Sequence, residues 1–387
     1  MASKVTALAW RPQTFSDLVG QDVISRTLQN SIKYDRLHHA YLFAGLRGSG
    51  KTSMARIFAK ALNCEKGPTP EPCLECSACI EIRNNNSMDV VEIDAASNNS
   101  VDNIRELREM VRYSAARDTY KIYIIDEVHM LSASAFNALL KTLEEPPPNV
   151  VFIMATTELH KIPATILSRS QQFDFRQIPI FKIEERVKKI VVSESIHMDD
   201  ESIALISMAA KGSLRDALSI FDQVVAASGE KITALDVESI LGVVKDIHLI
   251  DLMDGVVSGS AERVLTRVSE LVHSGHDLKG VYDSFTSFVR DLIILKSVTN
   301  PSDLVIRQHG DPEQFKDILE NVSHGDLVRY LNALLNGEPL FRQVSIPQYG
   351  FELVLLKMLE LKKLIPLETL IADLKASGLG GDEKKNI

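Results

Sequence analysis

Cysteine, tryptophan and long hydrophobic runs are all scarce in this sequence of 387 residues. There are 4 cysteines and 1 tryptophan, and aromatic residues make up 6% of the chain. So few cysteines exclude a disulfide-rich scaffold, and 19 glycines with 14 prolines exclude a collagen-like chain. No run approaches the roughly 20 apolar residues that a transmembrane helix needs. The first ten residues lack the apolar segment of a secretory signal, so we expect a cytoplasmic protein.

The composition is that of a folded globular protein, with 45% apolar and 25% charged residues. The length predicts two or three domains. The formal net charge is −9, and the excess of acid lies in residues 181–387, whereas residues 1–180 are balanced. We therefore expect any nucleic-acid-binding face in the first half.

Apolar strand-like runs alternate with helical patterns along the first 175 residues. Each run is four to six residues long and near-continuous, which is typical of parallel strands covered on both faces. This pattern predicts a doubly wound α/β core. The predicted strands are 40–44, 89–94, 121–126, 150–155 and 171–175.

Strand signals nearly vanish after residue 179, and helical periods punctuated by glycine take over. The sequence predicts an α/β core over 1–179, a helical lid over 180–243 and a second all-helical unit over 244–368. Residues 369–387 are polar and glycine-rich and read as a tail. Predicted helices in the lid are 183–196, 200–210, 213–227 and 234–241. In the second helical unit they are 246–258, 261–274, 277–298, 312–321, 324–336 and 348–364.

The strongest local signal is a complete phosphate-binding loop between the first predicted strand and a helix. The pattern is G-x-x-x-x-G-K-[ST], and its glycines let successive backbone N–H groups face phosphate oxygens. Its lysine reaches the β- and γ-phosphates, and its threonine is a Mg²⁺ ligand. The predicted nucleotide-binding residues are Gly45, Leu46, Arg47, Gly48, Ser49, Gly50, Lys51, Thr52 and Ser53.

Two carboxylates follow the strand that ends at residue 126. Ligands of open α/β sheets bind at the carboxyl ends of the strands. With the loop above, Asp126 is predicted to hold Mg²⁺ together with Thr52, and Glu127 to polarise the attacking water. Two threonines, 156 and 157, follow the next strand.

All four cysteines, Cys64, Cys73, Cys76 and Cys79, lie within 16 residues. Four thiolates at this spacing suit tetrahedral Zn²⁺. Two disulfides are disfavoured in a cytoplasmic chain, and an iron–sulfur cluster remains the alternative. We predict a structural zinc site.

The motifs in this order resemble those of the AAA+ ATPases, and more closely the tau/gamma family of bacterial DNA polymerase III clamp-loader subunits. The segments that carry the resemblance are 10–21, 38–52, the cysteine insertion, 126–132 and 137–147. They cover the chain densely from residue 4 to about 245, and the rest fits in helical pattern alone. The resemblance implies that 244–368 is the helical collar through which the subunits oligomerise.

The resemblance implies roles for residues that carry no signal of their own. Thr157 matches sensor 1, Arg169 the arginine finger that acts on a neighbouring subunit, and Arg215 sensor 2. The family usually has cysteine after the finger arginine, where this chain has Ser170. The resemblance also implies an adenine pocket that includes Ala7, Arg11 and Val19.

The implied function is that of an ATPase motor. It opens a sliding clamp with Mg-ATP and leaves it on primed DNA during replication in the nucleoid-associated replisome. The implied partners are delta and delta-prime type subunits, in a heteropentamer with several copies of this chain. The holoenzyme is a nucleotidyltransferase, but no polymerase active site is expected here. The chain reads as a gamma-like short form or a shortened tau form. Candidate DNA-phosphate contacts are Arg105, Lys141 and Lys161.

Two other functions are compatible with a phosphate-binding loop. A AAA+ helicase or branch-migration motor shares it, but the cysteine insertion and the acidic second half speak against this class. A non-hydrolysing ring adaptor tends to lose the loop lysine or the acid pair, and both are present here.

Overall fold

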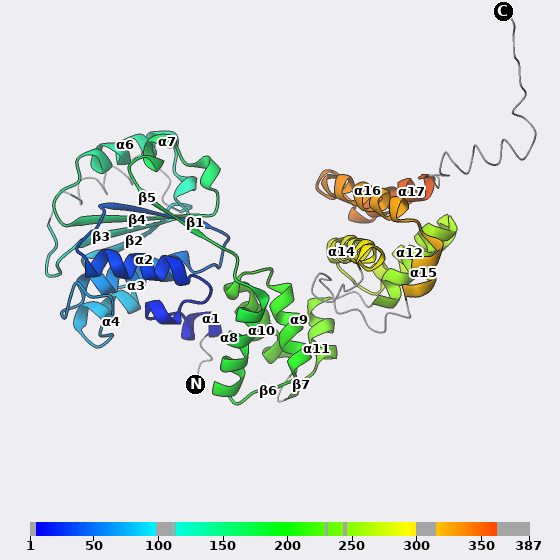
Figure 1. Ribbon diagram of the computed structural model, residues 1–387, viewed down its shortest axis with the longest axis horizontal. Coiled ribbons are helices and arrows are strands. Elements are labelled where there is room, and N and C mark those ends of the chain that lie inside the picture. The colour runs from blue at the N-terminus through cyan, green and yellow to red at the C-terminus, as the bar shows by residue number, and fades with distance from the viewer. Residues whose placement is uncertain are drawn as a thin grey trace, which may run out of the picture. The chain divides into compact units, whose positions relative to one another are not determined.

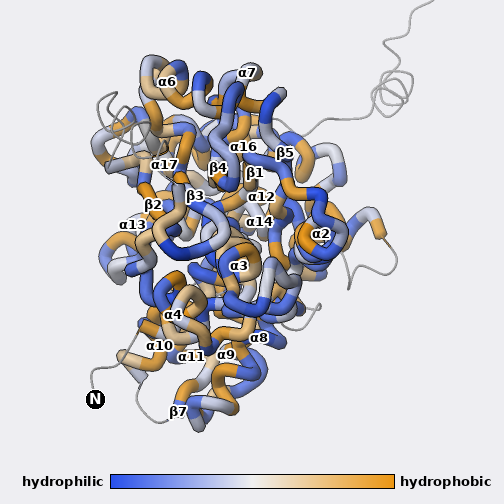
Figure 2. The backbone as a smooth tube through the Cα atoms, turned by 90° about the vertical axis from the view of Figure 1, so that its left-hand side faces the viewer, coloured by the Kyte–Doolittle hydropathy of each residue, from blue (hydrophilic) through white to orange (hydrophobic). Residues whose placement is uncertain are grey.

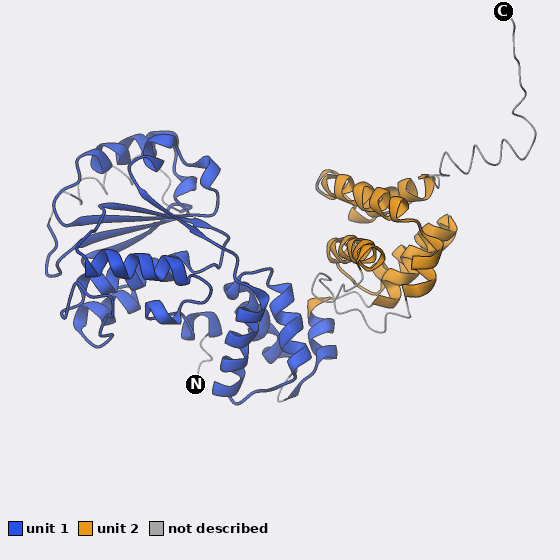
Figure 3. Cartoon of the chain, viewed as in Figure 1, with its two compact units in different colours: residues 1–240 blue, residues 241–387 orange. Residues whose placement is uncertain are grey.

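The computed structural model describes residues 5–97, 111, 114–228, 231–242, 246–298 and 315–361. The chain divides into two compact units, unit 1 over residues 1–240 and unit 2 over residues 241–387 (Figure 3). Among the described residues, two buried hydrophobic clusters lie in unit 1 and one lies in unit 2.

Unit 1 is built on a five-stranded sheet in which every pairing is parallel. The strand order is β2-β3-β4-β1-β5, which places β1 and β4 in the interior of the sheet. The predicted strands are thus confirmed to within about a residue at each end. The strands are β1 (Ala40–Gly45), β2 (Val90–Asp94), β3 (Lys121–Asp126), β4 (Val150–Thr156) and β5 (Gln171–Phe175).

Helices cover both faces of the sheet, with α2, α3 and α4 on one side and α6 and α7 on the other (Figure 1). Successive side chains of a strand point to opposite faces. Tyr41 and Phe43 therefore belong to the cluster with α2 and α3, whereas Leu42 belongs to the cluster with α6. This confirms the doubly wound class. The helices are α2 (Asp22–Lys33), α3 (Lys51–Asn63), α4 (Ser77–Asn84), α6 (Ala133–Glu144) and α7 (Ala164–Leu167).

Helices α2 and α3 show why the sequence folds in layers. Hydrophobic and hydrophilic stretches alternate along both (Figure 2), and the apolar ones turn toward the sheet. Met54, Ile57 and Phe58 of α3 are fully buried. The described residues of the α/β part also contain the short helix α1 (Thr6–Ala9) and the 3-10 turns η1 (Phe15–Asp17), η2 (Val128–Met130) and η3 (Leu159–Lys161).

The predicted lid segment contains four helices, as its periodicity indicates, and the first begins three residues earlier than predicted. The sequence missed two strands of two residues, β6 (His197–Met198) and β7 (Lys231–Ile232), which pair in parallel. Segments this short have no period to detect. The helices are α8 (Ile180–Ser193), α9 (Asp200–Ala209), α10 (Leu214–Ser228) and α11 (Ala234–Leu241).

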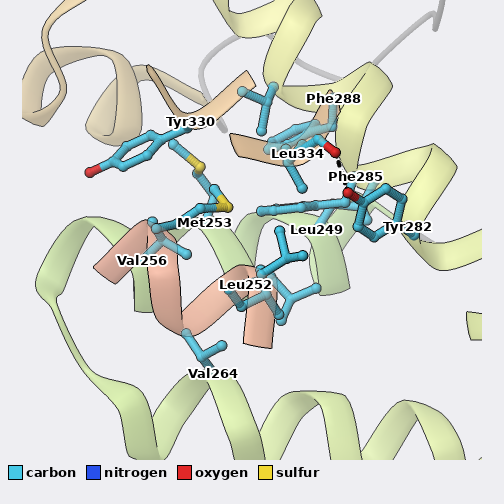
Figure 4. Close-up of a cluster of buried hydrophobic side chains, with 14 of the residues drawn as sticks. Leu249, Leu252, Met253, Val256, Val264, Tyr282, Phe285, Phe288, Tyr330 and Leu334 are labelled. Carbon is cyan, nitrogen blue, oxygen red and sulfur yellow. Dashed lines mark hydrogen bonds between the residues drawn. The ribbon is translucent and has the colours of Figure 1, made fainter. Parts of the chain in front are cut away.

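The described part of unit 2 is helical. Its buried cluster gathers side chains from α12, α13, α14 and α16, and the hydroxyl of Tyr282 donates to the carbonyl of Leu334 within it (Figure 4). The helices are α12 (Asp246–Ser258), α13 (Ala261–His273), α14 (Leu278–Ser297), α15 (Lys316–Asn321), α16 (His324–Gln343) and α17 (Pro347–Glu360).

Helix α16 departs from its predicted range. It runs to Gln343, seven residues past the predicted end, with Pro339 inside it. An interior proline removes a helix hydrogen bond and usually ends the helix, so the sequence favoured an early stop. Packing of α16 against α14 and α17 holds the longer helix instead.

Some predictions fall on residues that the structure does not describe. Arg105 and the predicted tail 369–387 lie outside the described residues, as do 312–314 at the start of a predicted helix. Across the described residues, no helix has both the length and the apolarity to cross a bilayer.

Candidate active site

The phosphate-binding loop joins the carboxyl end of β1 to the first turn of α3. Gly45, Gly48 and Gly50 all have positive φ, at 144°, 77° and 103°. A Cβ on Gly45 would lie 2.3 Å from the Phe175 carbonyl oxygen of the paired strand β5. Glycine is therefore required by both backbone conformation and space. The loop leads straight into a helix N-terminus, which favours anions.

Lys51 begins α3, and its side chain folds back over the loop. Its Nζ donates to the carbonyl oxygens of Gly45 at 2.8 Å and Leu46 at 3.0 Å. The residue is 5% exposed. Burial lowers the pKa of Lys51, while the nearby Glu127 and Asp126 carboxylates act in the opposite direction. The ammonium thus lies between the loop and the acid pair.

Thr52 and Asp126 meet although 74 residues separate them. The Thr52 hydroxyl donates to Asp126 Oδ2 at 2.7 Å. Neighbouring hydroxyl and carboxylate oxygens at a strand end are ligands that suit Mg²⁺. The predicted pair is therefore brought together, and its donor set fits the metal.

Glu127 follows β3 with a left-handed backbone, at φ 48°. This conformation is uncommon for a residue with a side chain and marks functional sites. Its Oε2 accepts hydrogen bonds from the Thr157 hydroxyl at 3.0 Å and the Thr157 backbone N–H at 3.3 Å. The two residues predicted as the water-polarising base and as sensor 1 are thus in direct contact.

His129 was not singled out from the sequence, yet it lies at the centre of this contact. Its ring Nδ1 is 3.0 Å from Thr156 Oγ1 and 3.4 Å from Glu127 Oε2, and its Nε2 is 3.4 Å from Glu158 Oε1. Its side chain is 6% exposed. The sequence signal for this residue was a histidine two positions after the acid pair. Its burial could not be predicted, because it depends on the 3-10 turn η2 (Val128–Met130).

The lid meets the phosphate-binding loop at the start of α10. A Cβ on Gly48 would lie 2.0 Å from Ser213 Oγ and 3.1 Å from Arg215 Cβ. Arg215 therefore lies beside the loop. This is the position expected for a lid residue that contacts the terminal phosphate. The loop from α9 brings it there through Gly212, whose carbonyl accepts from the Ile178 N–H at 3.1 Å.

The segment predicted to form the adenine pocket also borders the loop. Gln21, 3% exposed and not predicted, donates from Nε2 to the carbonyl of Arg176 at 2.8 Å and of Ser49 at 3.4 Å. Val19 lies two residues before Gln21. Burial lowers the pKa of Arg11, with a smaller effect of the same sign from Arg56.

The N-terminal helix α1, which contains Ala7, packs against the lid helix α10. The Thr6 backbone N–H donates to the Asp222 carboxylate at 2.9 Å. The N-terminal segment thus contacts both the core and the lid.

Arg169 follows α7 and pairs with α6. Its Nη2 is 2.8 Å from Glu144 Oε1, and its Nη1 donates to the Thr165 carbonyl at 3.0 Å. These partners belong to α6 and α7 and not to the phosphate-binding loop. Lys141 is exposed on α6, and Lys161 is exposed and pairs with Glu158 at 2.9 Å.

The four cysteines converge directly after α3. Their Sγ atoms all lie within 4.8 Å of one another, and all four are free thiols. The Cys73 N–H points to Cys64 Sγ at 3.4 Å, and the Cys76 N–H to Cys73 Sγ at 3.3 Å. Backbone donors stabilise thiolates, and the N–H groups of Glu75 and Cys76 lower the pKa of Cys73 to about 6. The donor set suits a tetrahedral metal ion.

Three family models match successive parts of the chain. "DNA polymerase III, delta subunit" matches residues 20–179, and "DNA polymerase III clamp loader subunit, ATPase lid domain" matches residues 182–230. "DNA polymerase III subunits gamma and tau domain III" matches residues 232–374. Together they follow the same order as the α/β core, the helices α8–α10 and unit 2.

Curated relatives extend along nearly the whole chain. DNA polymerase III subunit tau of Bacillus subtilis is 40% identical over 96% of this chain and 68% of its own length. Subunit gamma of Buchnera aphidicola is 34% identical over 92% of this chain and 97% of its own length. The chain belongs to the tau/gamma family of DNA polymerase III clamp-loader subunits. This is a family of AAA+ ATPases, so the nucleotide and Mg²⁺ expected from the loop agree with it.

Length differs among the members of the tau/gamma family. The chain spans 57% of subunit tau of Escherichia coli, to which it is 38% identical over 95% of this chain. Among solved structures, the Thermotoga maritima RuvB Holliday junction branch migration motor matches 64% of this chain and 79% of its own. That match has 15% sequence identity and a TM-score of 0.46.

Proposed function

We propose that this chain is the ATPase motor of a DNA polymerase III clamp loader. It couples Mg-ATP binding and hydrolysis to opening the sliding clamp and loading it on primed DNA. One observation carries the proposal: the loop lysine, the Thr52–Asp126 pair and the Glu127–Thr157 pair converge at the carboxyl ends of β1, β3 and β4. Family membership supplies the process in which such a site works.

Each residue has a task that follows from its place. Lys51 and the loop N–H groups hold the phosphates, and Thr52 with Asp126 holds Mg²⁺, which neutralises phosphate charge. Glu127 orients and polarises the attacking water, and Thr157 keeps its carboxylate aimed. Arg215 reaches the γ-phosphate from the lid and makes lid position depend on the nucleotide.

Arg169 acts on the ATP of a neighbouring subunit in a ring that holds delta and delta-prime type subunits. Its ion pair with Glu144 is half-exposed and therefore contributes little free energy. Arg169 can exchange Glu144 for a phosphate at little cost in free energy. An arginine supplied in this way stabilises charge in the transition state. Lys141 and Lys161 are exposed and available for phosphates of the DNA. Arg105, which lies outside the described residues, is proposed for the same role.

The cysteine cluster holds a structural Zn²⁺. The four thiols provide four ligands and leave no open position for chemistry, so the ion would stabilise the insertion and not take part in hydrolysis.

The test is steady-state ATP hydrolysis by this chain assembled with delta and delta-prime type subunits. We expect strong stimulation when sliding clamp and primed DNA are both present. Hydrolysis driven by DNA alone and indifferent to the clamp would contradict the proposal and favour a helicase motor.

Three substitutions separate the roles. Lys51→Ala abolishes ATP binding by the chain alone, and Arg215→Ala weakens it. Arg169→Ala leaves that binding unchanged but abolishes hydrolysis by the assembly, because the finger acts between subunits. Arg117→Ala is the matched control, since Arg117 is also a half-exposed arginine paired with a glutamate, at 2.9 Å from Glu81. Equal loss of hydrolysis in the control would overturn the finger role.

A further inference from the structure

Lys60 is a buried lysine that has no role in the ATP hydrolysis proposed above. It lies in the last turn of α3 and is 2% exposed. Burying an ammonium group is costly unless it has close partners. Its Nζ donates to the backbone carbonyl of Gln13 at 2.6 Å and to Gln13 Oε1 at 2.9 Å. Burial lowers the pKa of Lys60 to about 8, so the group keeps most of its charge at neutral pH.

Gln13 links Lys60 to the segment beside the nucleotide site through further hydrogen bonds. Its Nε2 donates to the carbonyl oxygen of Arg11 at 2.9 Å. Its backbone N–H and that of Thr14 both donate to Asp17 Oδ2, at 3.2 and 3.0 Å. Lys60 is therefore the point at which the helix after the phosphate-binding loop binds a segment that carries Arg11.

The same segment reaches the lid through Trp10. The indole N–H donates to Glu194 Oε1 at 3.1 Å, and the Arg186 guanidinium lies 5.4 Å from the ring centroid. Arg186 also donates to the Trp10 carbonyl at 3.3 Å. Segment 10–17 thus connects α3 of the core with α8 of the lid, and Lys60 is its attachment to α3.

The cysteine module, defined here as residues 64–84, packs on the helix that carries Lys60. Helix α4 of the module packs against α3 with Ala78, Cys79 and Ile82 buried. Beside the larger effect of burial, Cys79 raises and Arg83 lowers the pKa of Lys60. A metal ion that holds the four cysteines would keep α4 in this place.

We propose that Lys60 is a positioning residue for nucleotide binding, which it supports by fastening segment 10–17 to the phosphate-binding helix. We further infer that the cysteine module maintains this attachment by keeping Lys60 covered. The inference rests on the proposed nucleotide site, since it concerns the support of that site. Lys60 acts through Gln13 and need not touch the nucleotide.

The test compares ATP binding and tryptophan emission of the purified full chain. Trp10 is the single tryptophan, so its emission reports on segment 10–17. The variant Lys60→Met keeps a long side chain without the ammonium group. We expect its dissociation constant for Mg-ATP to be about tenfold larger and its Trp10 emission to lie at longer wavelength. Lys60→Arg should restore much of both. The milder Gln13→Ala tests the same attachment from its other end.

Asn63→Ala is the matched control. Asn63 is a buried polar residue of the same helix, 3% exposed, but its amide bonds to the backbone of Tyr120 at 2.8 and 2.9 Å, before β3. We expect Asn63→Ala to lower the melting temperature but to leave ATP affinity and Trp10 emission as in the unmodified chain. If both variants weaken ATP binding equally, the effect is general destabilisation and the inference is wrong.

Removal of metal tests the part played by the module. A zinc-selective chelator, with Mg²⁺ kept in excess, should shift Trp10 emission and Mg-ATP affinity of the unmodified chain in the direction of Lys60→Met. It should add little in Lys60→Met itself. An equal further loss in that variant would overturn the link between module and Lys60.

The outcomes also separate this inference from the proposed function. If the unmodified chain fails to bind Mg-ATP, or Lys51→Ala binds it equally well, the proposed nucleotide site is wrong. If binding depends on Lys51 but Lys60→Met and Gln13→Ala match the unmodified chain, the positioning role alone is refuted.

Discussion

Unit 1 buries polar side chains throughout, whereas the described part of unit 2 has a core that is almost wholly apolar. In the described part of unit 2 the buried charged residues are Asp291 and Asp326, and each has an arginine partner. Unit 1 buries a larger set: Gln21, Ser25, Ser49, Lys51, Lys60, Asn63, Asp89, Thr142, Thr156, Ser202, Ser207 and Ser213.

The backbones differ in the same direction. Seven non-glycine residues of unit 1, Glu127 among them, have positive φ, whereas in the described part of unit 2 positive φ is confined to glycines. Buried polar groups and left-handed residues both cost free energy. Unit 1 carries some of these costs at the nucleotide site, at Lys51 and Glu127, whereas the described part of unit 2 is built for packing. Function and stability should therefore respond differently to substitution in the two units.

The largest effect is expected at Glu127. Glu127→Gln keeps the size of the side chain but removes the carboxylate, so hydrolysis by the assembled loader should fall about 10²- to 10⁴-fold. Mg-ATP binding by the chain alone should persist, because Lys51 and the loop are unchanged. Unaltered turnover would show that Glu127 does not polarise the water.

In unit 2 the largest effect should be on stability. Phe285 is fully buried and packs edge-on against Phe351, with ring centroids 6.5 Å apart. Phe285→Ala should destabilise unit 2 by about 3–5 kcal/mol, measured by hydrogen exchange of its helices. Mg-ATP binding by the chain alone should not change. A loss of binding would mean that the two units are coupled more tightly than their separate cores indicate.

Asp89 tests a buried polar group of unit 1 away from the nucleotide. Burial alone would raise the pKa of Asp89, but N–H groups of Ala116, Arg117 and Asp118 at 2.7–3.0 Å, with the Lys121 ammonium, lower it overall. Asp89→Asn should cost about 1–3 kcal/mol at pH 7.

The pH dependence of that cost has a definite sign. A carboxyl whose pKa is lower in the folded state stabilises above its unfolded pKa, about 3.9, and the stabilisation is lost as pH falls through the folded value. Denaturant unfolding of both proteins from pH 7 to 3 should show the difference shrinking at the acid end. A constant difference would contradict the role of the ionised form.

The smallest effect should be the same in both units. Ser132 caps α6 by accepting from the Ala135 N–H at 3.2 Å, and Ser260 caps α13 by accepting from the Arg263 N–H at 3.3 Å. Ser132→Ala and Ser260→Ala should each cost about 1 kcal/mol in thermal unfolding. A larger loss of stability in Ser132→Ala than in Ser260→Ala would mean that Ser132 has a second stabilising role beside the cap.

Prediction from sequence succeeded where the signal is local. The strands of the core were found because each is a short apolar run. Helix α16 runs past its predicted end and across Pro339, because packing against α14 and α17 holds it. Residues without a local pattern, His129, Gln21 and Lys60, were missed as parts of the site.

The sequence by itself determined the α/β core, the phosphate-binding loop, the acid pair and the cysteine insertion. Periodicity, glycine conformation and ligand spacing act over a few residues and can be read directly. Only the tertiary structure decided that Thr157 holds Glu127, that Arg215 lies beside Gly48, and that Lys60 fastens Gln13. These contacts join residues 30 to 167 positions apart, and such contacts depend on how helices and strands pack, which no local pattern encodes.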